Sequence, residues 1–141
     1  MTLWLVRHAV TLAAPGTCYG RLDVAAEPSS TGIAAQALAA ALPRGVKVLS
    51  SPASRCRLLA AELARHRPDL AAAASDDRLQ EMDFGAWEGQ AWSAIGEAAL
   101  TRWTDDFAGH APGGGESVQA LLDRVASALH EARGQERPTV W

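Results

Sequence analysis

The feature that most constrains the fold of this chain is a short apolar run that ends in two basic side chains. Residues 3–6 are all apolar, and Arg7 and His8 follow directly. A run without polar alternation is typical of a central strand in a parallel sheet, which is covered on both faces. Ligands of open α/β sheets bind beyond the carboxyl ends of the strands. On its own the pair could equally end a strand in solvent, so further motifs have to decide.

The next segment predicts a long ordered loop and then a helix. Residues 14–32 contain several glycines and prolines and are expected to form the loop. A helix is expected over residues 33–42, with Ser30 or Thr31 as its N-cap and Pro43 stopping it. Loops of this length inside a compact domain are usually functional or disordered.

A second strand-turn-helix unit follows. The stretch VKVLSSP predicts a buried strand, and Ser51 with Pro52 predicts an N-cap and first helical position for a helix that reaches about Arg65. The later elements are a weak strand near residues 70–75, an aromatic helical stretch over 92–107, a helix over 117–133 capped by Ser117, and a strand begun by PTVW. This alternation predicts an α/β fold with a mostly parallel sheet and helices on both faces.

Length and composition limit the classes of protein. A chain of 141 residues fits one domain. A formal net charge of −3 argues against nucleic acid as a partner. The first apolar run is too short to span a membrane and lacks the flanks of a secretory signal, so we expect a cytoplasmic protein. The spacing of Cys18, Cys56 and the four histidines predicts no metal site.

Three of the segments carry side chains suited to binding and transferring a phosphoryl group. Arg7 follows the first strand and Arg55 lies near the start of the second helix. Guanidinium groups bind phosphate oxygens bidentately, and helix N-termini add backbone N–H donors. Two adjacent cations lower the pKa of an imidazole, so His8 is expected to be neutral and nucleophilic near pH 7.

The leaving oxygen in such a transfer needs a proton. A carboxylic acid in a partly desolvated loop is the usual donor. Glu81 is the candidate in the irregular segment after the third strand, and Asp83 and Glu88 are the alternatives in the same segment.

Four motifs in order resemble the histidine phosphatase superfamily, the phosphoglycerate-mutase-like proteins. They are LVRHAVT, SSPASRCRLLA, LQEMDFGAWEG and PGGGES, and the resemblance covers essentially the whole chain. It implies a phosphoglycerate-mutase-like fold that works without metal or organic cofactor. It also implies that His8 is the phosphorylated nucleophile, that Arg7 and Arg55 bind the phosphoryl group, and that Glu81 is the proton donor.

The resemblance also implies roles for residues in the first loop. Thr11 matches a hydroxyl residue that lines the phosphate pocket in relatives. The segment CYGRLDV, residues 18–24, looks most like the small bacterial branch that includes α-ribazole phosphatase. Tyr19, Gly20 and Arg21 are therefore expected to contact substrate at the entrance, and we call residues 18–24 the entrance loop.

The expected activity is hydrolysis of a small phosphomonoester through a phosphohistidine, with α-ribazole 5′-phosphate as the leading substrate. A phosphoglycerate-type mutase is the alternative enzyme, and a catalytically impaired phospho-ligand-binding protein is the alternative outside enzymes. The expected partner is a small-molecule phosphoester, with neither nucleic acid nor membrane. The oligomeric state stays open, a dimer being one option.

The sequence departs from the family pattern at several places. Ala9 replaces the usual glycine after the RH pair, and Ala14 replaces a common asparagine. Relatives carry a second catalytic histidine just after the strand that TVW begins, whereas this sequence ends at Trp141. We therefore expect one domain over residues 1–141 that lacks the last strand and helix of the family, an uncovered sheet edge, and impaired catalysis. His110 is an improbable replacement for that histidine.

Overall fold

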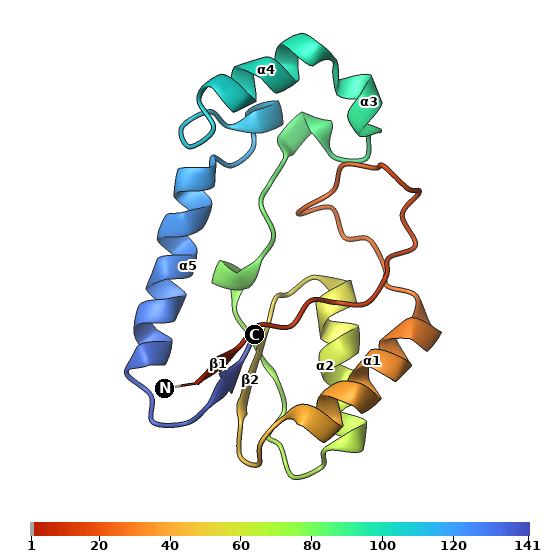
Figure 1. The fold of residues 1–141 in the computed structure, drawn as a ribbon, viewed down its shortest axis with the longest axis vertical. Helices are drawn as coiled ribbons and strands as arrows, with labels where there is room; N and C mark the ends of the chain where they lie inside the picture. Colours follow the sequence, from red (N-terminus) through yellow and green to blue (C-terminus); the bar gives the residue numbers. More distant parts are fainter. Residues whose placement is uncertain (1) are drawn as a thin grey trace.

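The computed structural model describes residues 2–141 and consists of a four-stranded parallel sheet with helices on either side of it (Figure 1). The strands are β1 (Leu3–Trp4), β2 (Lys47–Ser50), β3 (Ala74–Ser75) and β4 (Thr139–Val140). The α-helices are α1 (Pro28–Ala41), α2 (Ser54–His66), α3 (Trp92–Ile95), α4 (Glu97–Asp105) and α5 (Val118–Arg133), and the short 3-10 helices are η1 (Asp77–Leu79), η2 (Gly85–Trp87) and η3 (Pro112–Gly114). Within residues 2–141, no helix has both the length and the apolar character to cross a membrane. The predicted α/β fold with a parallel sheet is confirmed.

The strands follow the order β1-β4-β2-β3, and every neighbouring pair is parallel. The β1–β4 pairing continues past β1, since the amide of Val6 donates to the carbonyl of Trp141 over 2.8 Å. Among the described strands β1 lies at an edge, so the expectation of a central strand is wrong. Its apolar character has another cause, because Trp4 and Val6 pack against the core. Leu5, which follows β1, is 75% exposed.

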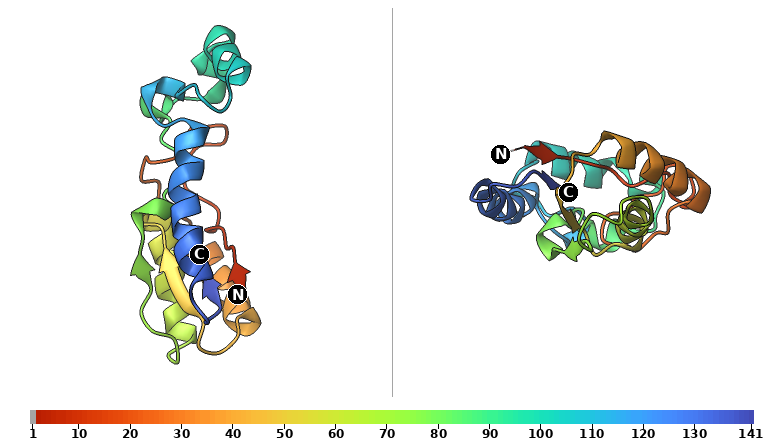
Figure 2. Two further views of the ribbon diagram at one scale, coloured as in Figure 1. Left: turned by 90° about the vertical axis from the view of Figure 1, so that its left-hand side faces the viewer. Right: turned by 90° about the horizontal axis from the view of Figure 1, so that it is seen from below.

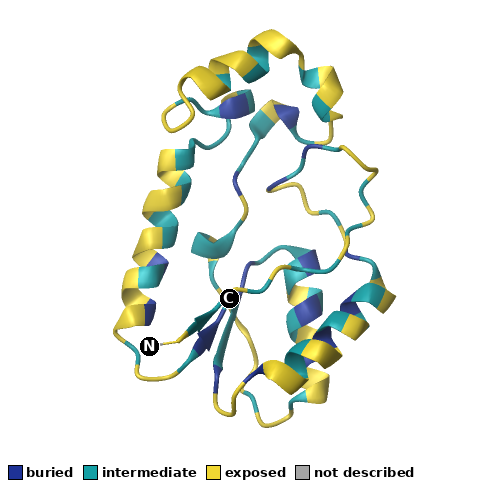
Figure 3. Ribbon diagram, in the orientation of Figure 1, coloured by how far each residue is buried: buried dark blue, intermediate teal, exposed yellow. Residues whose placement is uncertain are grey.

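The core lies between the sheet and the helix pair α1 and α2. Leu42, Val46, Leu63 and Val140 form its buried centre. Helices α1 and α2 pack against each other on one side of the sheet, and α5 runs along the other side (Figure 2). Figure 3 shows buried residues on β4, at the end of β2 and on the inner faces of these helices, and others in the loops and short helices beyond the sheet.

Helix α1 begins five residues earlier than the apolar pattern predicts. The carboxylate of Glu27 accepts hydrogen bonds from the amides of Ser29, over 2.9 Å, and Ser30, over 2.6 Å. Glu27 is therefore the N-cap, and Pro28 takes the first helical position. The prediction of Ser30 or Thr31 as the cap is wrong, because Ser30 is itself held by that cap.

Helix α2 begins at Ser54, two residues after the predicted start. Its N-cap position is Ala53, without a side-chain cap. The hydroxyl of Ser51 accepts from the amide of Ala53 over 3.3 Å and so closes the turn before the helix. For α5 the predicted cap is confirmed, because the Ser117 hydroxyl accepts from the amide of Ala120 over 3.2 Å.

Helices α3 and α4 lie far from the sheet, at the top of Figure 1. Aromatic rings hold this part together, with neighbouring centroids 5.3 to 6.4 Å apart. The rings belong to Phe84, Trp87, Trp92, Trp103 and Phe107. The segment that carries Phe84 and Trp87 also carries Glu81, so this cluster anchors one end of the segment that bears the candidate acid.

Candidate active site

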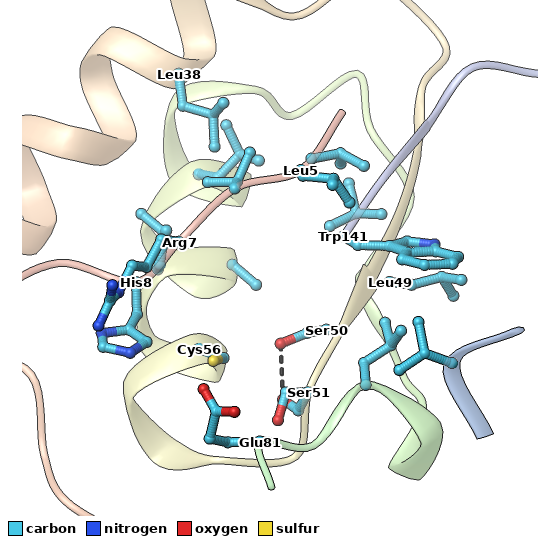
Figure 4. Close-up of a pocket in the computed structure, with 18 residues that line it drawn as sticks. Leu5, Arg7, His8, Leu38, Leu49, Ser50, Ser51, Cys56, Glu81 and Trp141 are labelled. Carbon is cyan, nitrogen blue, oxygen red and sulfur yellow. Dashed lines mark hydrogen bonds between the residues drawn. The ribbon is translucent and has the colours of Figure 1, made fainter. Parts of the chain in front are cut away.

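A cavity of about 530 Å³ opens where the chain leaves β1 and β2. Arg7, His8 and Glu81 line it together, as the sequence predicts (Figure 4). Figure 4 shows the polar side chains at one end and Leu5, Leu38 and Trp141 toward the other. The meeting of these three predicted residues in one cavity is confirmed, and their catalytic roles stay a prediction.

His8 is held in one tautomer. Its Nδ1 donates a hydrogen bond to the carbonyl of Ala9 over 2.8 Å, which leaves the lone pair of the neutral ring on Nε2. Burial lowers the pKa of His8 below its ordinary value, and the charges of Arg55 and Arg7 lower it further, while the Ala9 carbonyl and Glu81 oppose the change. The direction agrees with the sequence prediction, but burial rather than the arginines is the largest cause. Near neutral pH the ring is therefore uncharged.

Arg55 lies inside the molecule and is only 2% exposed. Its Nη2 donates to the carbonyl of Gly20 over 2.7 Å, and its Nη1 donates to the carbonyl of Leu22 over 3.2 Å. Its Cζ lies 5.3 Å from the centre of the Tyr19 ring. Its Nε is buried and has no hydrogen-bond partner within residues 2–141. In this structure the guanidinium holds the entrance loop and lines neither described cavity, and the predicted binding of the phosphoryl group by Arg55 stays a prediction.

The three candidate carboxylates have different surroundings. Asp83 accepts from the amide of Gly85 over 2.8 Å and so closes a turn. The carboxylate of Glu88 accepts from the backbone amides of Arg21, Leu22 and Phe84. Glu81 lines the cavity beside His8, where its Oε1 accepts from the amide of Met82 over 2.9 Å. The sequence predicts a partly desolvated acid, but Glu81 is exposed in the structure, so this expectation is wrong. Of the three, Glu81 is the one that shares the cavity with His8.

The structure places the predicted first-loop residues in two groups. The hydroxyls of Thr11 and Tyr19 lie 3.0 Å apart and hydrogen-bond to each other. Gly20 and Arg21 line a smaller cavity of about 170 Å³, which Glu81 also borders. Thr11 is therefore linked through Tyr19 to Arg55. Gly20 and Arg21 share the smaller cavity with Glu81.

A comparison of the sequence with models of known protein families identifies its family. The family model described as histidine phosphatase superfamily (branch 1) matches residues 3–141. The chain belongs to this superfamily. Among curated proteins, none matches the sequence.

Several solved structures superimpose on nearly the whole chain. The protein TTHB049 and a phosphoglycerate mutase, both from Thermus thermophilus, each share 31% identity and a TM-score of 0.77 with it. Both alignments cover 99% of this chain, and they cover 76% of TTHB049 and 75% of the phosphoglycerate mutase. A mycobacterial glucosyl-3-phosphoglycerate phosphatase shares 26% identity and a TM-score of 0.80, over 96% of this chain and 70% of its own. The phosphoglycerate-mutase-like fold is thereby confirmed.

The cavity also includes residues that the sequence did not predict for the site. Ser50, Ser51 and Cys56 line it. Burial raises the pKa of the Cys56 thiol. The sequence contains a signal for them, because Ser50 and Ser51 lie at the end of the second strand and Cys56 directly follows Arg55, a predicted site residue. Neither described cavity is lined by His110. Within residues 2–141, no group of three or more His, Cys, Asp or Glu side chains is placed to hold a metal ion.

Proposed function

We propose that this chain hydrolyses small phosphomonoesters through a phosphohistidine at His8. The observation that carries the proposal is the state of the His8 ring. Its Nδ1 is tied to a backbone carbonyl, its lowered pKa keeps it neutral, and it shares a cavity with Glu81. A neutral imidazole with a free Nε2 is the form that attacks phosphorus.

In the first step the lone pair on Nε2 forms a bond to phosphorus as the bond between phosphorus and the ester oxygen breaks. Glu81, in its protonated form, gives its proton to the departing oxygen, so an alcohol leaves. The positive charges of Arg7 and Arg55 stabilise the phosphoryl oxygens during the transfer. The product of this step is phosphohistidine with Glu81 as a carboxylate.

In the second step water attacks the phosphorus of the phosphohistidine. The Glu81 carboxylate takes a proton from that water, the bond between phosphorus and Nε2 breaks, and its electron pair returns to the ring. Inorganic phosphate leaves with His8 neutral and Glu81 protonated again. Each residue thus ends the cycle in the state in which it began.

The substrate proposed first is α-ribazole 5′-phosphate. The resemblance of the entrance loop to the small bacterial phosphatases supports this choice, with Tyr19, Gly20 and Arg21 at the entrance and Thr11 in the phosphate pocket. A mutase is the second candidate, because one of the similar structures is a phosphoglycerate mutase. The two reactions differ in the acceptor, which is water for a phosphatase and a second hydroxyl for a mutase.

A product assay tests the proposal. The protein is incubated with α-ribazole 5′-phosphate, with 3-phosphoglycerate and with 4-nitrophenyl phosphate, and the phosphorus products are followed by 31P NMR. Inorganic phosphate that disappears in His8→Ala supports hydrolysis, and an isomeric phosphoester indicates a mutase. A third result would favour a phospho-ligand-binding protein, namely no turnover together with vanadate binding that Arg55→Ala abolishes.

A further inference from the structure

One arginine of α5 binds the backbone just before Glu81 and at Glu81 itself. Arg124 donates from Nη1 to the carbonyls of Arg78, over 2.8 Å, and Gln80, over 2.7 Å. It donates from Nη2 to the carbonyl of Glu81 itself over 3.2 Å. Its side chain is 16% exposed, so solvent does not readily replace these bonds.

The same guanidinium binds Glu116 from two directions. Nε donates to Oε1 over 2.6 Å, and Nη2 donates to Oε2 over 2.8 Å. The pKa of Glu116 lies below its usual value, because its carboxylate accepts these bonds from Arg124. Glu116 in turn holds Asp83, since its amide donates to the Asp83 carbonyl over 2.7 Å and its Oε2 accepts from the Asp83 amide over 3.4 Å. The pair therefore clamps the chain before and after Glu81.

These bonds occupy the whole donor set of the side chain. An arginine has five N–H donors in a fixed fork, and in Arg124 five acceptors face them. A lysine has three donors on one nitrogen and cannot reproduce this geometry. The use of every donor indicates a specific fit and not a loose surface ion pair.

The backbone around Glu81 needs such a clamp. Residues 80–84, which we call the acid segment, lie between η1 and η2 and belong to no helix or strand. No regular ladder of backbone hydrogen bonds fixes them, so side-chain contacts decide where the Glu81 carboxyl group lies. A misplacement of about 1 Å in a catalytic group costs on the order of 10²-fold in rate.

We propose that Arg124, together with Glu116, is a positioning residue that aims Glu81 at the leaving oxygen. The proposal rests on the proposed function, since it takes Glu81 as the acid. Arg124 itself lines neither described cavity, so it acts through the acid segment and not on the substrate.

The leaving group of the substrate provides a test that a general structural role would not pass. A 4-nitrophenolate leaves without a proton, whereas an alkoxide needs one. In Arg124→Lys we expect kcat/KM for an alkyl phosphate to fall by about 10²-fold, the usual lower contribution of general acid catalysis, with kcat/KM for 4-nitrophenyl phosphate little changed. Equal losses on both substrates would overturn the proposal.

Arg78→Gln is the matched control. Arg78 also links this region to α5, through Glu131 over 2.7 Å and Ser127 over 3.4 Å, but its side chain does not bind the carbonyls of the acid segment. We expect the ratio of the two kcat/KM values to stay at the wild-type value in this variant. The same change of ratio in both arginine variants would contradict a role specific to Arg124.

Amide hydrogen exchange tests the clamp without any turnover. The amides of Met82 and Asp83 donate to the carboxylates of Glu81 and Glu116. We expect both to exchange faster in Arg124→Lys and at the wild-type rate in Arg78→Gln. Unchanged exchange in Arg124→Lys would refute the clamp. Failure of the wild-type protein to hydrolyse either ester would refute the proposed function instead, and the exchange rates would still decide whether Arg124 holds the acid segment.

Discussion

Gly20 lies so close to the backbone of Met82 that no side chain fits between them. A Cβ on Gly20 would come within 1.8 Å of the Met82 carbonyl oxygen. The carbonyl of Gly20 also accepts the 2.7 Å hydrogen bond from Arg55. The entrance loop, the acid segment and the buried arginine thus meet at one glycine, which gives Gly20 a packing role beside the substrate contact proposed for it.

Gly20→Ala is expected to destabilise the protein and to weaken phosphate binding. The new methyl group must displace backbone, because the nearest atom is the Met82 carbonyl oxygen, and the Phe84 ring also lies 3.0 Å away. Overpacking of this kind typically costs about 1–3 kcal/mol, to be measured by urea unfolding. Displacement of the Gly20 carbonyl also removes an acceptor that fixes the position of the Arg55 guanidinium, so inhibition by vanadate should require a higher concentration.

Gly32→Ala is the matched control for that substitution. Gly32 lies in α1, and nothing lies within 4 Å of a Cβ built there. The same methyl group should raise stability by about 0.5–1 kcal/mol, since alanine favours a helix interior. If the two alanine variants had equal stability, the close contact at Gly20 would not matter energetically.

Glu88 holds the entrance loop from the other side, so Glu88→Gln is expected to weaken phosphate binding about tenfold. The carboxylate accepts from the amides of Arg21, Leu22 and Phe84, and a glutamine has only one accepting oxygen. A hydrogen bond to a charged group contributes about 1.5–3 kcal/mol. Loss of one such bond would loosen the entrance loop, and the position of Arg55 would become less fixed. Vanadate inhibition measures the loss.

Glu62→Gln serves as the control for that effect. Within residues 2–141 the ion-pair partner of Glu62 is Arg65, over 3.2 Å, and the Arg65 side chain is 76% exposed. Exposed ion pairs contribute little. Vanadate affinity should therefore match the wild type in this variant, and equal losses in both glutamine variants would argue against a role for Glu88 in holding the loop.

The sequence predicted the meeting of Arg7, His8 and Glu81 because the position of each depends on a strand end or on the loop that follows one. Parallel strands bring their carboxyl ends to one edge, so the topology alone gathers these residues. The clamp formed by Arg124 could not be predicted in this way. Its acceptors are backbone carbonyls, which every residue has, and a contact between α5 and the acid segment has no pattern in the sequence.

The helix starts show a similar limit. Residues 28–32 of α1 have no apolar repeat, so the periodicity places the start at residue 33. Glu27 is not among the usual N-cap residues, yet its longer side chain reaches two amides of the first turn. The pattern of apolar residues predicts which face of a helix is buried better than it predicts where the helix begins.

Glu27→Gln is expected to lower the stability of the protein at pH 7 and to have a smaller effect in acid. The hydrogen bonds from Ser30 and Ser29 lower the pKa of Glu27 to about 2 from its usual 4.5. A lowered carboxylate pKa stabilises the fold above the unfolded value, and this stabilisation disappears as the pH falls from 4.5 toward 2. Thermal unfolding of both proteins from pH 7 to pH 2 measures the difference. A difference in melting temperature that did not vary with pH would show that the charge of Glu27 is not involved.

Arg7→Gln is expected to raise the pKa of His8. Burial is the largest cause of the lowered pKa, but the charges of Arg55 and Arg7 also disfavour the imidazolium. Without Arg7 the ring binds its proton at a higher pH, so the fraction of neutral His8 falls on the acid side. The acid limb of kcat/KM against pH should therefore move upward. NMR titration of the ring protons, assigned with His8→Ala, measures the same pKa without turnover.

Arg57→Gln separates this local effect from a change in net charge. Arg57 is an exposed residue of α2 and is not among the charges that act on His8. Both variants remove one positive charge, yet only Arg7→Gln should move the titration of His8. An equal shift in the two would mean that the overall field of the protein, and not the pairing of Arg7 with His8 at the end of β1, keeps the nucleophile neutral.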